Sequence, residues 1–158
     1  MTEIDTEDLA KRLDGSLEEL CRAAEGSRCT LRFDDPARGW HVNFIVAEAL
    51  TPGVKSLRGD GGIDQRAAAT VHWLAQHRRN LIQPDLINAP DPAPPPALLS
   101  AYAATAQMLA PLFNAEDHLQ GWISVHYVGG VRDLTERHEA ALSRARTSIA
   151  SLLGLPAQ

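Results

Sequence analysis

The chain has 158 residues, 44% of them hydrophobic and 22% charged, with a formal net charge of −5. These values are typical of one globular domain that buries roughly two-thirds of its unfolded surface. Acidic and basic residues are mixed along the chain, which speaks against a nucleic-acid surface. No apolar run reaches the ~20 residues of a membrane span, and the acidic start is unlike a secretory signal. We therefore expect a single cytoplasmic domain over residues 1–158 with neither nucleic acid nor a membrane as partner.

The N-terminal segment, residues 1–26, is predicted to be helical. One apolar stripe recurs at spacings of three and four, at Leu9, Leu13, Leu17, Leu20 and Ala24. A capping box that begins at Ser16 predicts a kink or a restart of the helix, and Gly26 is expected to end it. The two cysteines, Cys21 and Cys29, are expected to be reduced thiols, because they lack a Cys-x-x-Cys spacing.

The rest of the chain alternates between strand-like and helical segments. Expected in order are strands at 29–35 and 40–50, a loop at 51–62, a helix at 64–79 and a short strand at 80–86. After a proline-rich loop come a short helix at 96–105, strands at 106–113 and 119–128, and a last helix capped by Thr135. This order predicts an α+β domain with a mostly antiparallel sheet and flanking helices.

The strand "GWISVHYV", residues 121–128, carries two different faces. Side chains alternate along a strand, so Ile123, Val125 and Tyr127 share one side, and Trp122, Ser124 and His126 share the other. The first side is ordinary core. The second side, with an indole, a hydroxyl and an imidazole, is unusual for a strand that should be buried.

Several phrases together resemble the GAF domain, a small-molecule-sensing module. They are "VHWLAQHRRNLIQPDL", "AQMLAPLF", "LQGWISVHYV" and the Thr-Glu pair that opens the last helix, within a core from about residue 28 to 153. The resemblance implies an antiparallel sheet of about six strands. It also implies N-terminal and C-terminal helices on one face of the sheet and a ligand pocket on the other.

Eight residues are candidates for ligand contact: Gln107, Leu109, Trp122, Ser124, His126, Arg58, Arg66 and Asp85. The first five would line the pocket face of two neighbouring strands, where a few polar groups on an apolar wall suit a small molecule. Arg58 and Arg66 flank a glycine-rich turn and would pair with a ligand carboxylate. The alternative is that both arginines are solvated or neutralised by Asp60 and Asp64, and that Ser124 and His126 only bond each other.

The resemblance also excludes some activities of the family. The free methionine-R-sulfoxide reductases need loop cysteines and acidic pocket residues. Here residues 85–105 contain no cysteine, and Gln107, Ser124 and His126 stand at the acidic positions. The signature of cyclic-nucleotide-binding members is absent, as is the Cys-His pair that tethers bilins, because no cysteine follows Cys29.

We therefore predict a sensor that binds a small polar or aromatic metabolite, with no cofactor and no metal. It would signal through a partner or as a homodimer formed by the terminal helices. The alternatives are an enzyme that uses the same pocket, hydrolase-like through Ser124 and His126 or reductase-like, and a structural subunit whose pocket is filled by tryptophans.

Overall fold

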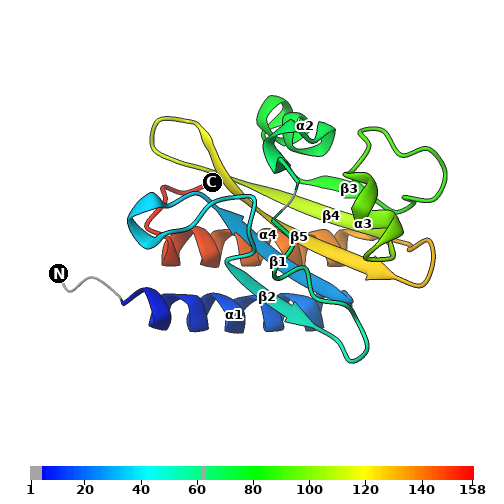
Figure 1. Cartoon of the computed structure of the whole chain (residues 1–158), viewed down its shortest axis with the longest axis horizontal. Helices are drawn as coiled ribbons and strands as arrows, with labels where there is room; N and C mark the ends of the chain where they lie inside the picture. Colours follow the sequence, from blue (N-terminus) through cyan, green and yellow to red (C-terminus); the bar gives the residue numbers. More distant parts are fainter. Residues whose placement is uncertain (1–4, 62) are drawn as a thin grey trace.

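The computed structural model describes residues 5–61 and 63–158 (Figure 1). Its helices and strands are α1 (Thr6–Ala23), β1 (Arg28–Phe33), the 3-10 turn η1 (Pro36–Arg38), β2 (Ala47–Leu50), the 3-10 turn η2 (Gln65–Ala67), α2 (Ala69–His77), β3 (Leu81–Gln83), α3 (Pro96–Ser100), β4 (Ala104–Phe113), β5 (Leu119–Val128) and α4 (Glu136–Leu152). None of the helices in these residues is long and apolar enough to cross a bilayer.

The strands form one antiparallel sheet in the order β2-β1-β5-β4-β3. The α+β fold is as predicted, but the sheet has five strands in the described residues, not about six. The expected second strand, 40–50, forms a ladder only over β2 and has an isolated bridge from Trp40 to Asp35 at its start. Ahead of β2, the Val42 N–H donates to Asp34 Oδ1 at 2.8 Å, so this backbone is satisfied by a side chain instead of a ladder.

Helices α1 and α4 cover one face of the sheet, as the sequence predicted (Figure 1). Their apolar stripes pack together with Ile123, Val125 and Tyr127 in the larger core cluster. The stripes that suggested a dimer interface are therefore used within the chain, where removing them from water stabilises the fold.

The opposite face of the sheet is covered by α2, α3 and their loops (Figure 1). A smaller core cluster here joins Trp122 and Leu109 of the sheet to Val71 and Leu74 of α2. Each side of the sheet therefore has its own apolar layer, and polar side chains on β1, β4 and β5 lie beside the smaller layer.

Several helix boundaries differ from the prediction. Helix α1 is continuous through Ser16, so no restart of the helix occurs there. The carboxylate of Asp14 accepts the Glu48 N–H of β2 at 3.0 Å. Residues Gln65–Ala67 form η2 instead of the first turn of α2, and α3 ends at Ser100, ahead of β4, which begins at Ala104. Helix α4 begins after Thr135 as predicted, in a capping box with His138.

Gly121 is required where β5 pairs with β1, opposite Phe33. A Cβ atom at this position would lie 2.3 Å from the carbonyl oxygen of Arg32 and 2.7 Å from the ring of Phe33. We expect Gly121→Ala to lower the free energy of unfolding by about 1–3 kcal/mol, because β1 or β5 must shift. Gly15, exposed in α1 with open space around it, is the matched control. Urea unfolding should show Gly15→Ala stabilised by about 0.5–1 kcal/mol, and a neutral Gly121→Ala contradicts the predicted clash.

Candidate functional site

A cavity lies between the sheet and the loops that cover it beside α2 and α3. Five of the eight predicted residues line it: Gln107, Leu109, Trp122, Ser124 and His126. Strand β1 adds Thr30 and Arg32, and the covering segments add Leu57, Asp60 and Tyr102. The cavity offers about 50 Å³ to the centres of water molecules, each of which needs roughly 10–15 Å³. It therefore has room for a few waters or a compact small molecule.

Strand register brings polar residues from four strands into one row. Gln83 of β3 lies opposite Gln107 of β4, which lies opposite His126 of β5, which lies opposite Arg28 of β1. All four are buried. A buried polar group is costly unless it is hydrogen-bonded, so this row must be satisfied by its neighbours or by a ligand.

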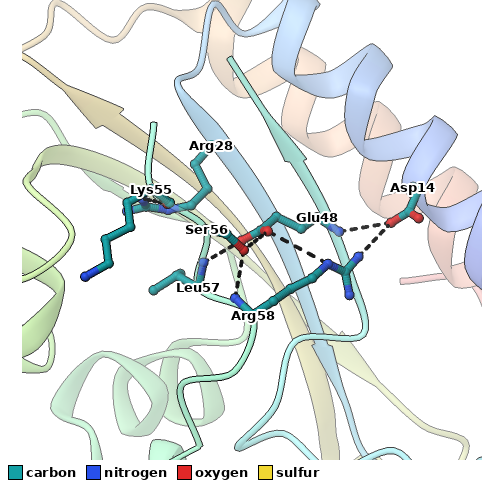
Figure 2. A network of polar contacts seen from close by, with 7 residues as sticks. All are labelled: Asp14, Arg28, Glu48, Lys55, Ser56, Leu57 and Arg58. Carbon is teal, nitrogen blue, oxygen red and sulfur yellow. Dashed lines mark hydrogen bonds and ion pairs between the residues drawn. The ribbon is translucent and has the colours of Figure 1, made fainter. Parts of the chain in front are cut away.

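Arg28 satisfies the β1 end of the row and fixes two covering segments. Its Nε donates to His126 Nδ1 at 3.0 Å. Its Nη1 donates to the carbonyl of Lys55 at 2.7 Å (Figure 2), and Nη2 donates to the carbonyl of Tyr102 at 3.2 Å. One side chain thus ties β5, the loop after β2 and the segment after α3 to β1.

The two glutamines satisfy the other end of the row. Gln107 Nε2 donates to Gln83 Oε1 at 2.7 Å, and Gln83 Nε2 donates to the carbonyl of Pro92 at 2.7 Å. The proline-rich loop is therefore attached to the sheet through β3. The amide N–H of Gln107 is therefore satisfied by another buried glutamine.

His126 is held in one neutral form. Because Arg28 donates to Nδ1, the proton of the neutral ring is on Nε2. Burial, together with the charges of Arg28 and Arg32, holds the pKa of His126 well below its usual value of 6.5. His126 therefore contributes an uncharged imidazole to the cavity, with Nε2–H as a donor.

Arg32 brings a positive charge to the cavity wall, which Asp60 also lines. It is 6% exposed, and its Nη1 donates to the carbonyl of Val42 at 3.0 Å. Burial lowers the pKa of Arg32 to about 10, so the guanidinium remains charged at neutral pH. In residues 5–61 and 63–158, no carboxylate lies within 4.0 Å of it.

Glu48 positions the loop that carries Leu57 (Figure 2). Its side chain is 3% exposed and accepts hydrogen bonds from the Ser56 hydroxyl and, at 2.8 Å, from the Leu57 N–H. Arg58 reaches back from the same loop to Glu48 at 3.9 Å and to Asp14 on α1 at 3.3 Å. Leu57 is thereby fixed as part of the cavity wall.

A second contact joins the two covering segments to each other. The Tyr102 hydroxyl donates to Asp60 Oδ2 at 2.7 Å, and this bond raises the pKa of Tyr102. Asp60 lies in the loop after β2 and Tyr102 follows α3, so this bond closes the cover over the cavity.

The other three predicted residues do not line the cavity. Arg58 contacts Glu48 and Asp14, and Arg66 pairs with Asp34 at 2.5 Å. The carboxylate of Asp85 accepts the N–H groups of Ile87 and Asn88, as in an Asx turn. A ligand contact by any of the three stays a prediction.

Sequence reasoning missed the contribution of β1. In its segment "RCTLRF", Arg28, Thr30 and Arg32 alternate with Cys29, Leu31 and Phe33, which belong to the helix-side core. The same period of two that separated the faces of β5 was present here and was not applied. The distant partners of Arg28, at Lys55 and Tyr102, leave no such signal in the sequence.

The site lacks the arrangement of a serine nucleophile. In the described part of the chain, Ser124 makes no side-chain hydrogen bond to His126, and Nδ1 of His126 is taken by Arg28. Nor do the described residues contain a group of three or more His, Cys, Asp or Glu that could hold a metal ion. The cavity wall presents hydrogen-bonding side chains together with the charged groups of Arg32 and Asp60.

Comparisons with known proteins give one family match and a shared fold. The model of the GAF domain family matches residues 8–154. In fold, the chain is similar to the cyanobacteriochrome receptor PixJ (TM-score 0.73, 18% identity, covering 93% of this chain and 95% of that one). It is also similar to the blue-light-absorbing PixJ GAF domain of Thermosynechococcus elongatus (0.72, 20%, 96% and 89%). A third similar structure is the phycocyanobilin-bound GAF domain of a cyanobacterial phytochrome (0.66, 13%, 96% and 95%). No curated protein sequence matches the chain.

The neutral state of His126 predicts a specific loss of stability in acid. The unfolded chain takes up a proton near pH 6.5, while the folded site resists it, so stability falls as pH drops below 6.5. Between pH 7 and pH 5, this group should cost about 1–2 kcal/mol. His126→Gln should remove that part of the pH dependence. His72→Gln, at an exposed position on α2, should keep it. Equal slopes for all three proteins in urea unfolding would contradict the buried neutral imidazole.

Proposed function

Because the chain belongs to the GAF domain family, we propose that it is a sensory domain that binds a small organic molecule reversibly. The proposed site is the cavity over β1, β4 and β5, and the proposed unit is one GAF domain over residues 1–158. The observation that carries the proposal is the cavity wall itself, in which Ser124, His126 and Arg32 are buried beside Trp122 and Leu109. A few polar groups converging on an apolar wall are what small-molecule sites share.

The ligand we propose is not covalently attached and is smaller than a bilin. One structural neighbour is a phycocyanobilin-bound domain. In this chain, however, both cysteines are buried in the helix-side core, on the face of the sheet away from the cavity. The cavity, with its room for a few waters, also favours a compact molecule. A bilin held without a covalent bond remains the competing outcome of the experiment below.

We propose that ligand binding acts through the covering segments. These segments are fastened to the sheet and to each other by Arg28, Glu48 and the bond from Tyr102 to Asp60. A ligand that favours the closed arrangement would shift the population toward it. The proposal includes the cytoplasm as the location, which two free thiols support.

Native mass spectrometry tests the binding function directly. We expect protein purified from its own source to carry one small molecule, which denaturation releases for identification. Ser124→Leu should abolish this binding, because the larger side chain fills the cavity at a position that makes no side-chain hydrogen bond in the described structure. Ser151→Leu, at an exposed position near the end of α4, is the control and should retain the molecule.

The outcomes of this experiment separate the candidates. A released molecule that absorbs visible light as a bilin does would replace the metabolite in this proposal. A substrate converted on incubation, with product released, would favour an enzyme. A protein that carries nothing and shows no thermal shift with a metabolite library would support the structural-subunit alternative.

A homodimer through the terminal helices remains a prediction. Because the apolar stripes of α1 and α4 are buried within the chain, it would have to use their outer faces. A shallow groove runs between these helices, lined mainly by small and charged residues, among them Ala23, Ala141, Ala145, Glu19 and Arg144. Light scattering at micromolar concentration should give twice the chain mass of 17.1 kDa. A mass equal to that of the single chain would leave signalling to a different partner.

A further inference from the structure

We propose that the ligand of this cavity carries a carboxylate that pairs with Arg32. The inference rests on the proposed function and names the chemistry that the site selects. It follows from a charge balance around the cavity, from the donors that surround Arg32, and from the apolar wall beside it.

The charge of Arg32 is buried without a counterion in contact. Of the carboxylates around the cavity, Glu48 accepts from Ser56 and Leu57, and Asp60 accepts from Tyr102. Both lie beyond the 4.0 Å limit of an ion pair with Arg32. A buried charge is costly unless it is paired, so the closed cavity is poised to gain stability from an anion.

Hydrogen bonding to Arg32 is incomplete within the chain. A guanidinium has five N–H donors, and the described residues provide Arg32 with one hydrogen bond, to the carbonyl of Val42. Arg28, on the same face of β1, shows the contrast, because its donors reach His126, Lys55 and Tyr102. Arg28 is used to build the site, whereas most donors of Arg32 remain for a ligand.

The neighbours of Arg32 are also suited to an anion. Thr30 and Ser124 are buried residues that lie opposite each other on β1 and β5, and their hydroxyls, which line the cavity, make no side-chain hydrogen bond in the described structure. His126 offers Nε2–H, since its Nδ1 is already an acceptor. Hydroxyl and imidazole donors beside a guanidinium can bind the oxygens of one carboxylate, to which the planar arginine fork is matched.

The rest of the ligand must be compact and mainly apolar. Trp122 lies beside Arg32 in the cavity, and Leu109, Val71 and Leu98 complete the apolar wall. We therefore infer a small organic monocarboxylate with an aliphatic or aromatic body.

Matched pairs of probes test the charge. Propionate and benzoate are compared with propionamide and benzamide, which keep the shape but lack the charge, at equal ionic strength in sodium chloride. We expect at least one carboxylate to raise the melting temperature as its concentration rises, and to bind roughly 10- to 100-fold more tightly than its amide. Titration calorimetry gives the two dissociation constants.

Variants assign the effect to Arg32. Arg32→Gln should abolish the preference for the carboxylate over the amide, without lowering the melting temperature of the free protein, because the uncompensated buried charge is removed. Arg32→Lys keeps the charge and should retain part of the preference. Arg12→Gln, at an exposed cation on α1 away from the cavity, should leave the preference unchanged. A merely structural Arg32 would instead lower the melting temperature and leave the preference intact.

Failure of this inference is distinguishable from failure of the proposed function. Equal binding of carboxylate and amide, or a preference that survives Arg32→Gln, overturns the inference. No thermal shift with either carboxylate also overturns it. If native mass spectrometry then releases a stoichiometric neutral molecule, the binding function stands without the anion. If Arg32→Gln does not fold, Arg32→Lys and the amide comparison still decide.

Discussion

The cavity depends on the buried guanidinium of Arg28. Its three hydrogen bonds reach an imidazole on the neighbouring strand and the main chain at Lys55 and Tyr102. Removing a buried donor leaves its acceptors without a hydrogen bond. The free-energy cost of such an unsatisfied group is larger than the net stabilisation that one hydrogen bond provides. The orientation of His126 and the position of both covering segments are therefore consequences of one side chain on β1.

Two arginines on one face of β1 serve different purposes. Arg28 finds its acceptors within the chain, and this makes it part of the framework. Within the described residues, Arg32 has one acceptor, at Val42, and faces the cavity beside hydroxyls for which these residues provide no side-chain hydrogen bond. Most buried polar groups in folded proteins have hydrogen-bond partners. The sites where such partners are missing are expected to be functional.

Local periodicity was sufficient to predict much of this arrangement. Alternation along β5 identified Trp122, Ser124 and His126 as one face, and the structure places them around one cavity. The fold class and the side on which the terminal helices pack also followed from pattern and family resemblance. The ion pair between Arg58 and Asp14 was not predicted, because Asp14 lies on a helix that is distant in sequence. Pairings such as these depend on tertiary geometry, which a one-dimensional pattern does not contain.

The cover of the cavity is attached mostly through main-chain oxygens. Arg28 bonds the carbonyls of Lys55 and Tyr102, and Gln83 bonds the carbonyl of Pro92. Every residue type has such a carbonyl, so the attachment places little restriction on which side chains the covering segments carry. Related chains could therefore exchange these segments, and with them the molecule they recognise, while the sheet beneath stays the same. One sheet could then carry binding sites for ligands of different chemistry in proteins that differ only in these loops.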